Sequence, residues 1–352
     1  MSYIDDIKSA ASINLPWEKL RGCNILVTGA TGLIGSTLVE VLMEHPDKNY
    51  HIYATGRDEK RAKQLFSHYM EDSSFHFFLY DVTKPMDGDT NFQYIIHAAS
   101  NASPNFFASK PVEVMKANIM GVVNLIEYGI KHELHRFLLV SSGEIYGEGD
   151  GRIFTEDYSG YVDCTSVRAC YPSSKRAAET LCVSYASQFG IDVNIARLSH
   201  VFGPNFTKSD NRVYAQFIRN LLRDEDIVMK STGSQFRSWC YVVDCVSALL
   251  FIMLKGENGQ AYNVAGNNSN ITILDLAKII AKQKNRKIVF EDPSLVEKTG
   301  YNIVKKSIFD TKKLKSLGWS TCGYTIQNNI KKTIKELERR IINKDNPLRF
   351  NG

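Results

Sequence analysis

The stretch that decides the fold is NILVTGATGLIGSTLVEVLMEH, residues 24–45. A short apolar run leads into a turn that contains Gly29, Gly32 and Gly35, and apolar residues then recur at helical spacing as far as Met43. A pyrophosphate at the start of such a helix would meet free backbone N–H groups, and a side chain at Gly32 would block it. This predicts a dinucleotide-binding strand, turn and helix, with a ligand-free helix start as the alternative.

The strand and helix pattern recurs along the first 200 residues. Short apolar runs end in polar turns and are followed by stretches with helical spacing. Alternating strands and helices with short links predict a Rossmann-type doubly wound parallel sheet, covered by helices on both faces. The segments that carry this pattern after the first unit are 50–55, 58–70, 75–80, 94–100, 111–132, 136–142, 171–190 and 192–199.

Beyond residue 200 the alternation becomes less regular, with expected helices at 211–223, 244–255 and 273–283. We therefore expect a smaller α/β carboxy-terminal lobe that binds the substrate. The predicted organisation is a leader, an NAD(P)-binding Rossmann domain, and a mainly substrate-binding lobe with some segments that return to the Rossmann domain; the bounds are 1–20, 21–200 and 201–352.

Composition excludes several functional classes. The chain has 352 residues, of which 43% are hydrophobic and 23% charged, and its net charge of +5 is small, so nucleic-acid binding is not expected. The longest apolar run, 248–254, is too short to span a membrane. Seven cysteines without a C-x-x-C pair are interpreted as small core residues of a reduced, cytoplasmic protein. No metal site is predicted.

A second pattern concerns catalysis. Tyr171 and Lys175 are four residues apart, so a helix places both side chains on one face. A nearby ammonium and an oxidised nicotinamide would lower the pKa of a tyrosine, and the phenolate could take a proton from a sugar hydroxyl. Ser142 ends a parallel strand, where ligands of such sheets bind, and could hydrogen-bond the same oxygen. A structural Tyr and Lys, and a Ser142 that merely caps a turn, are the alternatives.

The end of the second strand bears on cofactor choice. Many NAD-binding sheets have an acidic residue there that binds the ribose hydroxyls. Here the chain reads YATGRDEK, residues 53–60. Arg57 could stack on adenine or pair with the 2′-phosphate of NADP, and Asp58 could still reach the ribose of NAD. NAD is preferred, with NADP possible and a solvated Arg and Asp as the alternative.

The ordered motifs resemble the extended short-chain dehydrogenase/reductase family of nucleotide-sugar epimerases, dehydratases and decarboxylases. The resemblance runs from about residue 22 to 285 and includes VTGATGLIGS, YDVT, HAAS, KANIMG, VSSGEIYG, YPSSK, FGP, RSWCYVVD and YNVAG. It implies that Tyr171 is the base, that Lys175 tunes it and binds the ribose, and that Ser142 positions the substrate. It also implies that Asp81 and Val82 contact adenine, that Ala98, Ala99 and Ser100 line the cofactor, and that Asn118 supports the site from its helix. The candidate cofactor contacts argued from the residues themselves are Gly29, Thr31, Gly32, Leu33, Ile34, Gly35, Arg57 and Asp58.

Members of this family oxidise a sugar at C4 and differ in what happens to the 4-ketone. Gly143 stands where 4,6-dehydratases have an aspartate, and Glu144 resembles the glutamate of the UDP-glucuronate decarboxylases, although those usually have a hydroxyl-bearing residue at the Gly143 position. By this resemblance Glu144 would steer the sugar ring or a proton-relay water, and Arg237 would neutralise the anionic substrate or assist protonation. A surface carboxylate and an arginine that serves only the diphosphate are the alternatives. Arg212 is a further candidate diphosphate contact, with a solvated arginine as the alternative.

The resemblance therefore implies a decarboxylase-like enzyme acting on a nucleotide sugar, with a 4-epimerase or 4,6-dehydratase as the alternative. A non-catalytic NAD(P)-binding sensor or scaffold is a reading of a different class. The family also implies a homodimer through the helices expected at 112–131 and 171–188.

Overall fold

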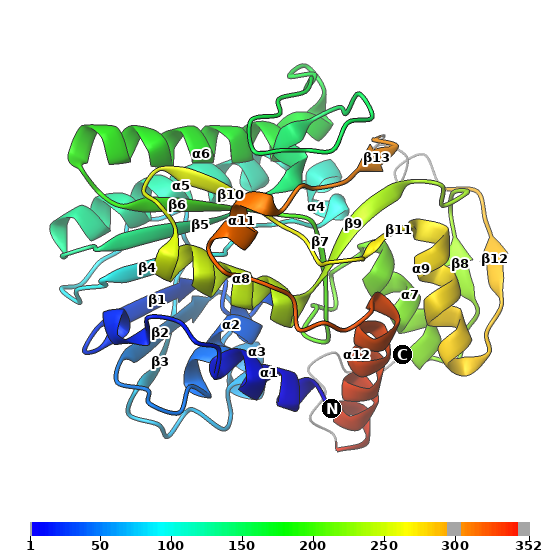
Figure 1. Ribbon diagram of the computed structural model, residues 1–352, viewed down its shortest axis with the longest axis horizontal. Helices are drawn as coiled ribbons and strands as arrows, with labels where there is room; N and C mark the ends of the chain where they lie inside the picture. The colour runs from blue at the N-terminus through cyan, green and yellow to red at the C-terminus, as the bar shows by residue number, and fades with distance from the viewer. Residues whose placement is uncertain (1, 294–303, 344–352) are drawn as a thin grey trace.

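The computed structural model describes residues 2–293 and 304–343. Its centre is a seven-stranded, wholly parallel sheet in the order β10-β6-β5-β4-β1-β2-β3 (Figure 1). This confirms the predicted Rossmann-type fold. The strands are β1 (Asn24–Thr28), β2 (His51–Gly56), β3 (Phe75–Leu79), β4 (Tyr94–His97), β5 (Arg136–Ser142), β6 (Val193–Leu198) and β10 (Gln260–Val264).

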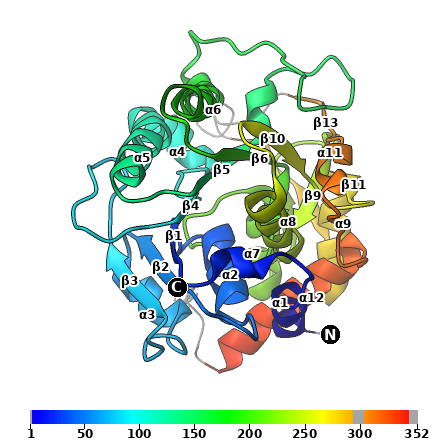
Figure 2. The ribbon, with the colours of Figure 1, turned by 60° about the vertical axis from the view of Figure 1, so that its left-hand side comes forward.

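Helices cover both faces of the sheet because neighbouring strand residues point to opposite sides. In β1, Ile25 and Val27 belong to one buried cluster and Leu26 to the other. The cluster of Ile25 includes residues of α1 (Tyr3–Ala11), α2 (Leu33–Met43), α3 (Glu59–Leu65) and α8 (Val242–Lys255); the cluster of Leu26 includes residues of α5 (Pro111–Lys131) and α6 (Cys170–Phe189). Figure 2 shows α5 and α6 side by side, apart from α2 and α8.

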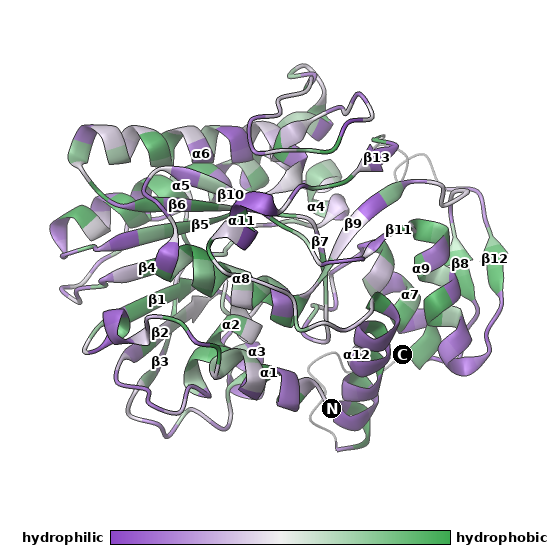
Figure 3. Cartoon of the chain, viewed as in Figure 1, coloured by the Kyte–Doolittle hydropathy of each residue, from purple (hydrophilic) through white to green (hydrophobic). Residues whose placement is uncertain are grey.

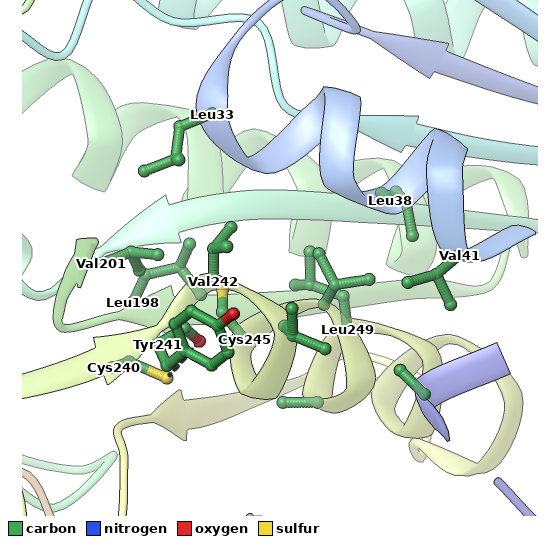
Figure 4. Close-up of a cluster of buried hydrophobic side chains, with 14 of the residues drawn as sticks. Leu33, Leu38, Val41, Leu198, Val201, Cys240, Tyr241, Val242, Cys245 and Leu249 are labelled. Atoms are coloured by element: carbon green, nitrogen blue, oxygen red, sulfur yellow. Dashed lines mark hydrogen bonds between the residues drawn. The ribbon is translucent and has the colours of Figure 1, made fainter. Parts of the chain in front are cut away.

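The packing of α2 against α8 fixes the helix that starts at the glycine turn. Leu33, Leu38 and Val41 of α2 lie opposite α8 across a buried apolar layer (Figure 4). Leu33 is only 6% exposed and the other two are fully buried. Burial of such side chains is worth about 1.5–3 kcal/mol each, so the helix start is held rigidly. The residues facing α2 in this layer are Leu198, Val201, Val242, Cys245 and Leu249.

A smaller lobe follows β6. Strands β7 (His200–Phe202), β11 (Asn270–Thr272) and β13 (Lys306–Ser307) pair with β9 (Phe236–Tyr241), while β8 (Ile227–Met229) pairs with β12 (Ile288–Phe290). Helices α7 (Val213–Leu222) and α9 (Ile273–Ala281) pack against each other beside them. Between these segments, α8 and β10 return to the main sheet. The chain therefore crosses between the two lobes more than once.

The helices at the two ends of the described chain join the body of the protein. Figure 3 shows α12 (Ile326–Ile342) largely in hydrophilic colours, yet Ile330, Ile334 and Leu337 are buried. Lys332 of this helix lies 2.7 Å from Asp6 of α1, with both side chains mostly buried. Helix α1 of the expected leader is thus packed against α12.

Two sequence expectations need correction. The helix expected over 58–70 ends at Leu65, because Phe66 leaves the helical conformation and is fully buried. The cysteines are all free, but Cys164 and Cys322 are exposed in loops and are not core residues. Within the two described ranges, no helix combines the length and apolarity needed to cross a bilayer.

Candidate active site

A cavity of about 1550 Å³ lies between the main sheet and the smaller lobe. Its wall contains the glycine turn after β1, the ends of β4 and β5, the start of α6, and residues of α7 and β9. The order of the main sheet reverses between β1 and β4, and ligands of such sheets bind outside the carboxyl ends of the strands at that point. Among the residues described, no cluster of His, Cys, Asp and Glu is arranged to hold a metal ion.

The glycine turn has the geometry of a phosphate cradle. Gly32 is the N-cap of α2 and no side chain caps this helix, so its first N–H groups are available to an anion. A Cβ on Gly32 would meet only the carbonyl oxygen of Gly29, at 3.3 Å. A Cβ on Gly35 would lie 2.8 Å from the Cα of Ala30 and closer still to that carbonyl. Gly35 is thus required by the fold, whereas Gly32 leaves room for a ligand.

The second strand brings Arg57, but not Asp58, to the cavity. Arg57 is exposed and its Nη2 lies 3.1 Å from Oδ1 of Asn101. Asp58 is the N-cap of α3 and accepts the N–H of Arg61 at 2.9 Å, so it serves the helix start. Asp81 and Val82 line the same end of the cavity.

Asn118 lies behind the cavity wall and does not line the cavity itself. It is 1% exposed, its Oδ1 accepts from Ser100 at 2.8 Å, and its Nδ2 donates to Ser174 at 2.9 Å. Ala98, Ala99 and Ser100 themselves line the cavity. Because Ser174 lies on α6, this chain of hydrogen bonds fixes the end of β4 relative to the helix that carries Tyr171.

Tyr171 and Lys175 come together near the start of α6, as the four-residue spacing predicts. Lys175 is 2% exposed, its Nζ donates to the carbonyl of Val140 at 2.9 Å, and it lies 5.9 Å from the centre of the Tyr171 ring. Burial lowers the pKa of Lys175 to about 8. Burial raises the pKa of Tyr171 to about 12; the charge of Glu144 adds to the rise, and a hydrogen bond with Ser142 opposes it.

Ser142 caps a turn and lies beside Tyr171. Its Oγ accepts the N–H of Glu144 at 3.2 Å and so caps the short 3-10 helix Gly143–Tyr146. The same hydroxyl lies close enough to Tyr171 to lower the pKa of the phenol. Turn capping therefore holds the hydroxyl beside the candidate base.

Glu144 forms an ion pair that the sequence analysis did not anticipate. Its Oε1 lies 2.7 Å from Nη2 of Arg168, and both side chains are about four-fifths buried. The Arg168 guanidinium carbon lies 4.6 Å from the centre of the Phe107 ring, on α4 (Pro104–Ser109). The Phe107 ring stacks on the Tyr171 ring, with 4.7 Å between their centres. The Glu144–Arg168 ion pair and the candidate base Tyr171 thus belong to one packed cluster. The only signal of this cluster in the sequence was the position of Arg168, three residues before Tyr171.

The two candidate substrate arginines both line the cavity, in different states. Burial lowers the pKa of Arg237 to about 10, with Glu144 opposing the fall, and its guanidinium donates to the carbonyls of Phe236 and Val304. Arg212 is bound in bidentate fashion by Asp210, with its Nε 2.9 Å from Oδ1. Burial acts to lower the pKa of Arg212, but the Asp210 carboxylate outweighs burial and raises it.

Comparison with known proteins identifies the family. Residues 25–265 match the model of the NAD dependent epimerase/dehydratase family. The chain belongs to this family. The match confirms the predicted resemblance and that the protein is an enzyme, and the family description names NAD, the predicted cofactor.

Relatives of this chain include two plant UDP-glucuronic acid decarboxylases. It is 35% identical over 299 residues to UDP-glucuronic acid decarboxylase 5 of Arabidopsis thaliana, covering 84% of each chain. It is 37% identical over 260 residues to UDP-glucuronic acid decarboxylase 6 of the same plant, covering 73% of each.

Solved structures agree on the fold. UDP-glucuronic acid 4-epimerase from Bacillus cereus, in complex with UDP-glucuronic acid and NAD, is 22% identical, with a TM-score of 0.77 over 90% of this chain and 99% of that one. UDP-glucose 4-epimerase from Thermotoga maritima is 24% identical, with a TM-score of 0.74 over the same shares.

Proposed function

We propose that the protein converts a nucleoside-diphosphate sugar through a 4-keto intermediate without net oxidation, and that its substrate is UDP-glucuronate, which it decarboxylates to a UDP-pentose. The observation that carries this proposal is the meeting of Ser142, Tyr171 and Lys175 in one cavity with the glycine turn. A 1550 Å³ cavity is large enough for a dinucleotide and a nucleotide sugar together.

A cofactor bound in this cavity would supply the chemistry that removes two electrons and a hydrogen from C4 of the sugar and later returns them. The free N–H groups at the start of α2 hold its pyrophosphate, and Gly32 leaves the approach open. Lys175 and Tyr171 bind the nicotinamide ribose. Asp81, Val82 and Ala98 to Ser100 line the remainder of its path, and Asn118 fixes that wall from behind.

Oxidation at C4 requires that the hydroxyl lose its proton. Tyr171 takes this proton as a phenolate, and Ser142 hydrogen-bonds the same oxygen. In the free protein burial raises the Tyr171 pKa to about 12, and a bound oxidised cofactor would supply a positive charge that favours the phenolate.

The resulting β-keto acid loses carbon dioxide when the bond between C5 and the carboxyl carbon breaks. The electron pair moves toward the C4 oxygen, where protonated Tyr171 and Ser142 stabilise it. A proton then reaches C5, guided by Glu144 and its partner Arg168. Arg237 faces the anionic substrate, while Arg212, already bound by Asp210, contributes less free charge to the diphosphate.

Two arguments favour decarboxylation over the other reactions of the family. The curated relatives with 35% and 37% identity are UDP-glucuronic acid decarboxylases. Gly143 also stands where a 4,6-dehydratase has one of the two acidic residues that it uses to expel water.

A protein that only senses nucleotides would not need the cluster of Tyr171, Lys175 and Ser142, which is intact.

We further propose a homodimer formed through α5 and α6. Their outward faces carry exposed apolar side chains, among them Met120 and Ile130 on α5 and Val183 on α6. Pairing these faces between two copies would bury them in a four-helix interface. Seven free cysteines suit a reducing compartment such as the cytoplasm.

Incubation with a panel of nucleotide sugars tests the proposed reaction. We expect carbon dioxide and a UDP-pentose from UDP-glucuronate, and no 4,6-dehydration of dTDP-glucose. Turnover of UDP-hexoses alone would reassign the protein to the 4-epimerases or dehydratases.

A further inference from the structure

Gly143, between Ser142 and Glu144, has no side chain because an aromatic ring occupies that space. A Cβ built on Gly143 would lie 2.8 and 2.9 Å from Cε2 and Cε1 of Phe309 and closer still to Cζ. Carbon atoms in contact prefer about 3.5–4.0 Å, so no side chain fits at Gly143 while the ring stays in place. Phe309 lies outside residues 25–265, which the family model covers.

The ring of Phe309 is fixed from several sides. Its backbone N–H donates to Oγ of Ser238 at 3.1 Å. The residues on either side pair with Phe154: the N–H of Phe154 donates to Ile308 at 2.7 Å, and the N–H of Asp310 donates to Phe154 at 2.9 Å. The ring also packs edge-on against the Tyr146 ring, with 5.7 Å between the two ring centres. Phe309 is 7% exposed, so moving its ring would disturb a packed cluster.

Phe309 also lines the cavity, together with Ser142, Gly143, Glu144 and Tyr171. The strand just before it, β13, pairs with β9 so that Ser307 lies opposite Arg237. The aromatic ring therefore borders the cavity beside Gly143, the residue that follows Ser142 in the chain.

We infer that Phe309 is a specificity-determining residue, which holds the 4-keto sugar in one orientation so that C4 is reduced on the face from which it was oxidised. This inference rests on the proposed function. A 4-ketone has no configuration at C4, and reduction on either face consumes the same two electrons, hydrogen and Tyr171 proton. The orientation of the sugar ring alone decides whether the product keeps its C4 configuration or becomes the C4 epimer.

A rigid wall at Gly143 limits how far the keto sugar can turn. Without the ring, the sugar gains space on that side, and no side chain of Gly143 replaces the lost contact. Loss of one apolar contact in a binding pocket changes discrimination by about tenfold or more. We therefore expect a change in the ratio of products, which is distinct from a change in rate.

The test compares the products of UDP-glucuronate, followed by NMR, for the wild type and a set of variants. Phe309→Ala removes the wall, and Phe309→Leu shortens it with less risk to folding. Ile308→Ala is the matched control, because Ile308 is equally buried in the same segment but does not line the cavity. The ratio of products reports only on folded enzyme, so partial unfolding does not alter it.

We expect the share of C4 epimer plus released 4-ketone to rise by about tenfold in Phe309→Ala and by less in Phe309→Leu, with no rise in Ile308→Ala. Gly143→Ser should be destabilised, and the double variant Gly143→Ser, Phe309→Ala should regain stability, because the two positions share one space. An unchanged single product from Phe309→Ala, with the wild type still releasing carbon dioxide, would overturn this inference alone. A wild type that releases no carbon dioxide would overturn the proposed function instead.

Discussion

The Arg168 guanidinium lies 2.7 Å from the Glu144 carboxylate and 4.6 Å from the ring of Phe107, which in turn stacks on Tyr171. This arrangement ties the candidate base to an ion pair of opposite charges. The carboxylate raises the pKa of Tyr171 and the guanidinium lowers it, so each charge has a separate and testable effect on the base.

The first prediction concerns the pH dependence of kcat/KM. The reaction needs the phenolate of Tyr171, so activity rises as pH passes upward through its pKa. Removing the negative charge in Glu144→Gln lowers that pKa and moves the rising limb to lower pH. Removing the positive charge in Arg168→Met raises the pKa and moves the limb to higher pH. The exposed carboxylate of Glu127 on α5 provides a control variant, Glu127→Gln, that should leave the limb in place. Shifts of the same sign in both active-site variants would contradict the account.

The second prediction separates chemistry from cofactor binding. Tyr171→Phe keeps the stacking on Phe107 but removes the proton acceptor, so we expect turnover to fall by at least about 10²-fold. NAD should remain bound, as measured by chromatography of what the denatured protein releases. A Tyr171→Phe variant with an unaffected rate would exclude Tyr171 as the base.

The same chromatography identifies the cofactor. Finding NADP in the released material would overturn the cofactor assignment and place Arg57 on a 2′-phosphate.

The third prediction uses two glycines at the start of α2, the N-cap Gly32 and Gly35 in the first helical turn. Gly35→Ala places a Cβ against the backbone of Gly29 and Ala30 and should destabilise the fold by about 1–3 kcal/mol. Gly32→Ala meets only one carbonyl oxygen, at 3.3 Å, so the protein should fold nearly as well but bind NAD poorly. Thermal melting and NAD titration measure the two effects. Normal NAD affinity in Gly32→Ala would show that the cofactor does not approach this turn.

The fourth prediction concerns the helices at the two ends of the described chain. Asp6 and Lys332 form an ion pair with side chains 3% and 11% exposed, and Tyr241 also donates to Asp6 at 3.1 Å. Asp6→Ala leaves Lys332 without its buried partner and should lower the free energy of unfolding by about 3 kcal/mol. Urea unfolding measures this loss. The double variant Asp6→Ala, Lys332→Met should lose less than the sum of the two single variants, and strictly additive losses would mean that the pair is not coupled.

The sequence was sufficient to predict the parts of the fold that local pattern determines. The glycine turn, the alternation of strands and helices, and the placement of Tyr171 one turn from Lys175 all follow from spacing within one segment. Ser142 was predictable because ligands gather at the carboxyl ends of parallel strands. These features need no knowledge of distant contacts.

Other features depend on contacts between distant segments and had no local signal. Phe309 meets Gly143 because its segment pairs with β9 and with Phe154, and the sequence around either residue does not reveal this. Asp58, a candidate ribose ligand, caps α3 with its carboxylate, and the sequence did not reveal this contact. The packing of α1 against α12 brings together residues more than 300 positions apart.

The most direct test of the central claim follows the hydrogen at C4. UDP-glucuronate carrying deuterium at C4 and carbon-13 in its carboxyl group is incubated with the purified protein, and the products are followed by NMR. The account predicts one labelled carbon dioxide for each UDP-pentose formed, with the deuterium still on C4 of the product and no net change in cofactor oxidation. Release of carbon dioxide with loss of the C4 deuterium, or no release at all, would contradict it.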